Sequence, residues 1–400
     1  MQMNKHARNT RRLGILLALG LAVASASATA GDLERRQAKR IHDRLAGVPP
    51  TNAVLDAMEA DLVAGNPEAA ALKAMQHPAF YNVTLKNFAT PWTNEEQTVF
   101  APLNDYSATV IGMIRDDRDF REVLYGDYLY EGGSGVVPTP YSNTNNTHYV
   151  ELEQNGIDLS NPSNLVEVQQ TTRRPGVAPA GVITTRAAAR AFFIDGTNRA
   201  MFRFTMMNHL CTDLDPIKDN SRPADRIQQD VTRSPGGDSR IYMNACLGCH
   251  AGMDPLAQAY AYYQWDYSGD PDTGSLQYTA GVVQPKYLIN ENNFKFGYIT
   301  TDDSWTNYWR HGPNRNRLGW GACPGTVDSD GICHGSGAAS MGQELANTEA
   351  FASCQVKKVF RSVCFREPSN AELADVTTSF KAGYNMKTVF AKAAVACMGN

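Results

Sequence analysis

The stretch Cys246-Leu247-Gly248-Cys249-His250 is the most informative part of this 400-residue chain. Its pattern, C-x-x-C-H, is the attachment signature of c-type haem. On a helix the two cysteines lie one turn apart on one side, where their thiols can add to the two vinyl groups of a haem edge. His250 can then present a ring nitrogen to the iron from the proximal face. The stretch therefore predicts a helix carrying one covalent haem c, with Cys246 and Cys249 as attachment points and His250 as iron ligand.

Three simpler interpretations of the same cysteines stay open at this point. A thioredoxin-like dithiol would need a βαβ or cytosolic context and does not call for a following histidine. Half of a zinc site would need a second C-x-x-C, and the chain has none. A structural disulfide between Cys246 and Cys249 is the third interpretation.

The first 30 residues predict a signal peptide. Four basic residues precede an apolar run over 13–23, and the small residues 28–30 fit a cleavage site before Gly31. The run is too short and too rich in alanine for a comfortable membrane span. We therefore expect a periplasmic or secreted protein with no transmembrane segment after cleavage.

The charge of the chain argues against a nucleic-acid partner. The formal net charge is −4, and loss of the four basic residues of the signal peptide would change it to about −8. No basic patch or polybasic tail accompanies this balance. An exported, mildly acidic protein is expected to meet a redox partner protein instead.

The remaining six cysteines predict three disulfides, since their number is even and the chain is expected to be exported. Cys354 and Cys364 lie at the two ends of an apolar stripe of helical period. Ten helical residues span about 15 Å, well beyond the roughly 7 Å limit on the Cα separation of a disulfide. We expect the pairs Cys211–Cys354, Cys364–Cys397 and Cys323–Cys333, the last of which closes a short glycine-rich loop.

Two weaker motifs lie in that loop. Cys333 is followed by His334, so Cys323, Cys333 and His334 could form a second haem site with an enlarged spacer. The run 328–331 resembles the start of a calcium loop, but Ala339 stands where the loop would need an acidic residue. A polar turn is the better interpretation of that run.

The rest of the chain predicts a mainly α protein with long irregular loops. Two or three short helices are expected over 33–73, two more over 77–130, and irregular structure over 131–183.

Thr197 is expected to cap a helix ending near Cys211, and Asp254-Pro255 to begin an aromatic helix reaching Trp265. Its aromatic rings could wall the haem or form ordinary core. Ser369 and Glu372 form a capping box for a further helix. We divide the chain into a signal peptide (1–30), a helical and loop-rich region (31–183) and a haem region (184–400).

The pattern C-x-x-C-H-x-x-M-D-P over 246–255, followed by aromatic and acidic residues, resembles the cytochrome c-like module of large families of exported bacterial proteins. Cys354-Gln355-Val356 and Cys364-Phe365-Arg366 are similar to the small C-terminal helical unit of those families. The strong likeness covers about 30 residues, and a weaker one spans 185–400. The resemblance implies a c-type haem attached at Cys246 and Cys249, with His250 as proximal ligand. It implies no substrate.

The sixth iron ligand is open on the sequence alone. Methionine gives a high-potential electron-transfer site, histidine a lower potential, and an empty position permits substrate or peroxide chemistry. Met341 is the first candidate, because it follows a glycine-rich approach downstream of the motif. His311 comes next, then His148 and His209, and an iron without a second protein ligand stays an alternative.

The sequence thus predicts an exported monohaem c-type cytochrome that transfers single electrons. A haem oxidase or peroxidase with an open distal site is the first alternative, and a haem-containing envelope or surface component is the second. No hydrolase triad or phosphate-binding loop accompanies these motifs, so no residue is predicted to be catalytic.

Overall fold

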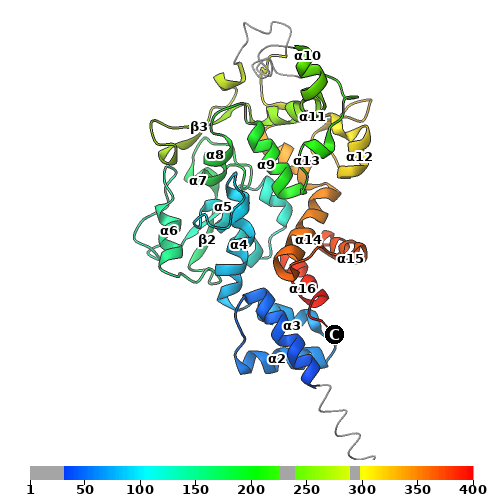
Figure 1. Cartoon of the computed structure of the whole chain (residues 1–400). Coiled ribbons are helices and arrows are strands. Elements are labelled where there is room, and N and C mark those ends of the chain that lie inside the picture. Colours follow the sequence, from blue (N-terminus) through cyan, green and yellow to red (C-terminus); the bar gives the residue numbers. More distant parts are fainter. Residues whose placement is uncertain (1–30, 225–238, 289–297, 400) are drawn as a thin grey trace, which may run out of the picture.

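The protein is predominantly helical, as the sequence predicts. The structure, a computed structural model, describes residues 31–224, 239–288 and 298–399. Helices make up 55% of it and strands 8%, and Figure 1 shows the helices packed along the length of the molecule with only short strands between them. The predicted signal peptide, residues 1–30, lies outside the described residues.

The described residues begin with a helix over 31–46. The α-helices that follow are α2 (Asn52–Val63), α3 (Pro67–Ala74), α4 (Lys86–Ala89), α5 (Asp105–Arg115), α6 (Thr147–Gln154), α7 (Gln170–Arg173), α8 (Arg186–Phe192), α9 (Arg199–Leu210), α10 (Ser239–Ile241), α11 (Leu247–Ala257), α12 (Pro313–Leu318), α13 (Ala338–Ala346), α14 (Glu349–Cys364), α15 (Asn370–Lys381) and α16 (Met386–Ala396). No helix among the described residues is long and apolar enough to cross a membrane.

Within the described residues, short helical turns and three small antiparallel sheets join these helices. The π-helical turns there are η1 (Phe80–Leu85) and η6 (Tyr242–Cys246), and the 3₁₀ turns are η2 (Thr90–Thr93), η3 (Phe120–Leu124), η4 (Asp215–Ile217), η7 (Gln258–Tyr260), η8 (Pro271–Thr273), η9 (Pro285–Leu288) and η10 (Tyr308–Arg310). The sheets pair β1 (Leu129–Gly132) with β2 (Leu165–Val168), pair β3 (Tyr263–Asp266) with β4 (Ser275–Tyr278), and place β7 (Cys333–Ser336) between β5 (Ser304–Asn307) and β6 (Thr326–Val327).

The first and last helices lie side by side. The helices over 31–46, α2 and α3 confirm the prediction for 33–73, with breaks at Pro49-Pro50 and at Asn66. The Gln37 side-chain amide donates to the Gly399 carbonyl at 2.7 Å, and Lys392 of α16 pairs with Glu68 of α3 at 3.3 Å. Figure 1 accordingly shows the C-terminus beside α3.

Helix α5 forms the centre of the fold. All of its residues are buried, and a reciprocal capping box between Asn104 and Ser107 begins it. Tyr130 of β1 lies flat against Gly112, where an added Cβ would come within 2.1 Å of the ring. One hydrophobic cluster runs from Ala38 to Ala394 around this helix, and the predicted division at 183/184 stays a prediction.

The C-terminal helices follow the sequence closely. Thr348 caps α14, whose apolar stripe is buried, and the predicted capping box of Ser369 and Glu372 begins α15. The buried residues of α16 include Val389 and Phe390, as its stripe predicts.

Two predicted segments differ from the structure. Residues 131–183 are not uniformly irregular, because α6 and the β1–β2 pair lie there; both are short, and β1 is buried on both faces, so neither produces a clear period. Helix α9 ends at Cys211 as expected, but Asn198 in the left-handed region occupies its N-cap position instead of Thr197.

The predicted aromatic helix after Asp254-Pro255 was wrong. Pro255 lies inside α11, and the chain leaves the helix at Tyr260 to form strand β3. Asp254 is not an N-cap because α11 already runs through it, and its carboxylate binds Arg199 and His250. Tyr260, Tyr263 and Trp265 belong to the main hydrophobic core.

Candidate functional site

One flank of α11 packs tightly against Trp309 and Asn220. A Cβ at Gly252 would lie 2.0 Å from the Trp309 ring, and one at Gly248 would lie 2.6 Å from Asn220 Oδ1. The two glycines are four residues apart and therefore share a flank. The Gly248 carbonyl also accepts the backbone N–H of Asp219 at 2.9 Å. Because the two glycines have no side chains, the backbone of α11 can lie close to Trp309 and Asn220.

The predicted attachment residues lie at the start of this helix. Cys246 ends the π-helical turn η6, and Cys249 and His250 lie in the first turn of α11. At 3.6 residues per turn, the three side chains would fall within about a third of a turn. Cys249 faces Leu214, next to the segment that packs on Gly248. Two free thiols and an imidazole therefore border one side of the helix, as a haem edge requires.

Substitution of Gly252 tests this packing. Gly252→Ala should lower the free energy of unfolding by about 2 kcal/mol, because the methyl group would overlap the buried Trp309 ring. Gly383→Ala is the matched control, since nothing lies within 4 Å of its added Cβ. Urea unfolding of both variants measures the difference. A Gly252→Ala variant as stable as the control would contradict the close packing of α11 on Trp309.

The cysteines divide into three disulfides and two free thiols. The disulfides are Cys211–Cys354, Cys323–Cys333 and Cys364–Cys397, which confirms all three predicted pairs. Cys246 and Cys249 are unpaired. This excludes, in this structure, the interpretation of the C-x-x-C as a structural disulfide.

The two free thiols have different surroundings. Cys246 packs beside the small apolar cluster of Tyr242, Leu247 and Ala251. Cys249 Sγ lies 3.7 Å from the Leu214 carbonyl, and burial raises the pKa of its thiol. The motif follows a π-helical turn and the sheets of the described residues are antiparallel, so the βαβ context of a thioredoxin-like dithiol is missing there.

A zinc site is also disfavoured by donor geometry. Within the described ranges, the only grouping of three or more cysteine, histidine or acidic donors close enough to share an ion is Cys323, Cys333 and Glu344. Its two sulfurs are bonded to each other. The donors of Cys246, Cys249 and His250 do not converge in this way.

The imidazole of His250 is held through one of its two nitrogens. Nδ1 lies 3.1 and 3.0 Å from the two carboxylate oxygens of Asp254, one helical turn along α11. No residue in the described part of the chain forms a hydrogen bond with Nε2. With the Nδ1 proton assigned from this partner, Nε2 is the nitrogen available to a metal.

Arg199 completes this arrangement from helix α9. Its Nε and Nη2 donate to the two oxygens of Asp254 at 2.7 and 3.1 Å, and its Nη1 donates to Thr197 Oγ1 at 2.6 Å. The Asp254 side chain is fully buried. Burial raises the pKa of this carboxyl, but Arg199 and His250 outweigh that effect and lower it to about 2. The sequence analysis missed Arg199, which lies far from the motif in sequence; the His250–Asp254 spacing was the available signal.

The sixth-ligand candidates are scattered. Met341 is fully buried in the main core, whereas His250 is partly exposed beside the separate cluster around Cys246. His311 precedes Gly312, at which an added Cβ would lie 2.6 Å from Asp219 Oδ2. Nε2 of His311 is buried without a hydrogen-bond partner and lies beside Gly331. The sixth ligand stays a prediction.

The remaining two histidines have structural roles. His148 Nε2 accepts the backbone N–H of Gly132 at 2.8 Å, and its Nδ1 donates to the Thr139 carbonyl at 2.7 Å. His209 is buried, with Nε2 2.7 Å from the Tyr106 hydroxyl. Both ring nitrogens of His148 are therefore occupied, whereas Nδ1 of the buried His209 has no hydrogen-bond partner.

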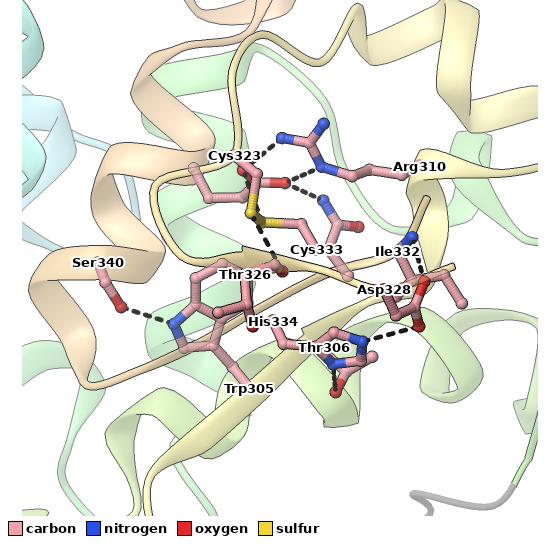
Figure 2. The surroundings of a disulfide bond; sticks show 12 residues. Trp305, Thr306, Arg310, Cys323, Thr326, Asp328, Ile332, Cys333, His334 and Ser340 are labelled. Atoms are coloured by element: carbon pink, nitrogen blue, oxygen red, sulfur yellow. Dashed lines mark hydrogen bonds and ion pairs between the residues drawn. A yellow bond between two sulfur atoms is a disulfide. The ribbon is translucent and has the colours of Figure 1, made fainter. Parts of the chain in front are cut away.

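The loop around Cys323 and Cys333 carries no second haem site. Figure 2 shows the two sulfurs joined, which leaves neither thiol for a vinyl group. The His334 ring forms hydrogen bonds through Nδ1 with Thr306 Oγ1 and through Nε2 with Asp328 Oδ2, both at 3.0 Å.

The acidic run after residue 327 forms a polar turn, as expected. Asp328 Oδ1 accepts the backbone N–H groups of Asp330 and Ile332 at 3.0 and 2.9 Å. Asp328 Oδ2 faces His334. The carboxylate therefore stabilises the turn itself.

Comparison with models of known protein families, with curated proteins and with solved structures finds no match.

Proposed function

We propose that the protein is an exported monohaem c-type cytochrome that transfers single electrons. One observation carries the proposal: Cys246 and Cys249 are the two cysteines left free, and they share a flank of α11 with a histidine whose Nε2 is available. The other six cysteines form disulfides. The C-x-x-C-H pattern is the haem attachment signature.

The residues present fit the group. Cys246 and Cys249 would hold the haem through thioether bonds, and His250 Nε2 would bind the iron. The haem would supply reversible one-electron transfer at iron. Ile241 and Met243, about half exposed one turn before Cys246, offer apolar surface next to the attachment residues. Asp254 keeps the His250 ring oriented toward that side.

Export and a protein partner are part of the proposal. Three disulfides are compatible with the periplasm or the extracellular space, where such bonds persist. The basic, apolar and small-residue pattern of 1–30 supports a signal peptide that is removed. The acidic net charge of the mature chain favours a redox partner protein with a basic or neutral surface and disfavours nucleic acid.

A haem enzyme with an open distal site is the second candidate. It is favoured by one observation: Met341, the leading sixth-ligand candidate, is fully buried in the main core, whereas His250 lies beside a separate small cluster. An iron without a second protein ligand would bind peroxide or another small oxidant, taking electrons from the protein partner.

Covalent haem is tested on the mature protein expressed with a cytochrome c maturation system. A pyridine haemochrome assay should give one haem c per chain. Cys246→Ser with Cys249→Ser should abolish covalent haem, whereas the control pair Cys323→Ser with Cys333→Ser should retain it. Absence of covalent haem from the unmodified protein would overturn the proposal.

The spin state then separates the two candidates. A low-spin six-coordinate spectrum supports the electron carrier, and a weak band near roughly 695 nm would indicate methionine as sixth ligand. A high-spin spectrum with rapid reaction toward hydrogen peroxide would replace the carrier by the enzyme.

A further inference from the structure

The carboxylate behind His250 has no role in holding the haem. Resting on the proposed function, we propose that Asp254, anchored by Arg199, is a positioning residue that fixes the His250 ring and lowers the reduction potential of an iron bound at Nε2. The haem would then exchange electrons with a partner of low potential.

The contact is charged, close and fixed. Both oxygens of Asp254 lie within 3.1 Å of His250 Nδ1, and the same oxygens receive the Nε and Nη2 protons of Arg199. The Asp254 side chain has no exposure to solvent. Water and salt therefore screen the interaction little.

The geometry fixes the tautomer of the imidazole. Because His250 and Asp254 are four residues apart on one helix, they face each other without any loop that could move. The carboxylate can only accept, so the proton of a neutral ring resides on Nδ1 and the lone pair on Nε2. The ring of Tyr242, 5.6 Å from that of His250 at 58°, contacts the imidazole from the side.

A carboxylate acceptor changes the reduction potential of the iron as well as the orientation of the imidazole ring. A histidine whose second nitrogen donates to a carboxylate is a more basic ligand than one that donates to a neutral group. A more basic ligand favours ferric over ferrous iron, which lowers the reduction potential. Arg199 keeps the carboxylate in place and neutralises part of its charge. It therefore limits how much the carboxylate lowers the reduction potential.

Asp254→Asn tests the charge while keeping an acceptor oxygen. In spectroelectrochemical titration of the haem-loaded protein, where the electrode supplies the electron, the ferric-to-ferrous ratio at a fixed applied potential should fall at least tenfold. That change equals a rise of about 59 mV in the potential. Asp213→Asn is the matched control: it removes a charge near Cys249, but Asp213 pairs with Arg203 at an exposed site and not with His250.

A shift in Asp254→Asn no larger than that in Asp213→Asn would overturn the inference, although covalent haem would still stand. A second measurement needs no change at residue 254. In the haem-free pair Cys246→Ser, Cys249→Ser, nitrogen-15 NMR should show the neutral His250 ring with its proton on Nδ1. A proton on Nε2 would overturn the inference even if no variant at 254 folds. The absence of haem from the unmodified protein would instead overturn the proposed function, and with it the claim about the potential, even if the NMR shows the expected tautomer.

Discussion

Removal of the Cys211–Cys354 disulfide should lower the free energy of unfolding by roughly 5 kcal/mol, more than removal of either other disulfide. The two cysteines are 143 residues apart in sequence, and the entropy that a crosslink removes from the unfolded chain grows with the length of the closed loop. The bond also joins the end of α9 to the middle of α14. Cys323 and Cys333 are only 10 residues apart, and their bond should contribute about 3 kcal/mol.

The comparison requires both cysteines of a pair to be replaced, so that no free thiol remains to exchange. Urea unfolding of Cys211→Ser with Cys354→Ser and of Cys323→Ser with Cys333→Ser gives the two values. An equal loss in both variants would show that loop length does not govern these disulfides.

Arg199→Met should lower the free energy of unfolding by about 3–5 kcal/mol, because it leaves the Asp254 carboxylate buried without its cation. The carboxylate is fully buried and Arg199 is its only arginine or lysine partner within the described residues. Methionine keeps most of the side-chain volume, so the loss reports charge and hydrogen bonds and not a cavity.

Arg203→Met is the matched control on the same helix. Arg203 lies one turn further along α9 and pairs with Asp213, and both side chains are more than a third exposed. An exposed pair contributes about 0–1 kcal/mol. Thermal unfolding should therefore give a clearly lower melting temperature for Arg199→Met than for Arg203→Met. Equal melting temperatures would contradict the buried ion pair as a stabilising element.

Much of the fold could be predicted from local patterns. The stripes of α14 and α16 repeat every three to four residues, and the capping box at Ser369 marks the start of α15. Helix geometry excluded Cys354–Cys364, and the three pairs expected among the remaining combinations are the observed disulfides. These predictions succeeded because each depends on residues close in sequence or on a simple limit of distance.

The errors arose where distant contacts decide local structure. Asp254 resembles a helix cap in sequence but lies inside α11, and Tyr263–Asp266, which the expected helix included, pair with β4 as strand β3. The site was predictable as far as Cys246, Cys249 and His250. Its support was not, since Trp309, Asn220 and Arg199 approach α11 from elements far away in the chain.

The two free cysteines lie inside the loop that Cys211 and Cys354 close, and this has a consequence for biogenesis. An unfolded chain with eight thiols has on the order of 100 complete pairings, but six thiols have only about 15. On the proposed function, attachment of the haem to the unfolded chain withdraws Cys246 and Cys249 before oxidation proceeds. Haem attachment would thereby reduce the number of wrong disulfide pairings. Chains that oxidise without haem would accumulate as isomers with scrambled disulfides.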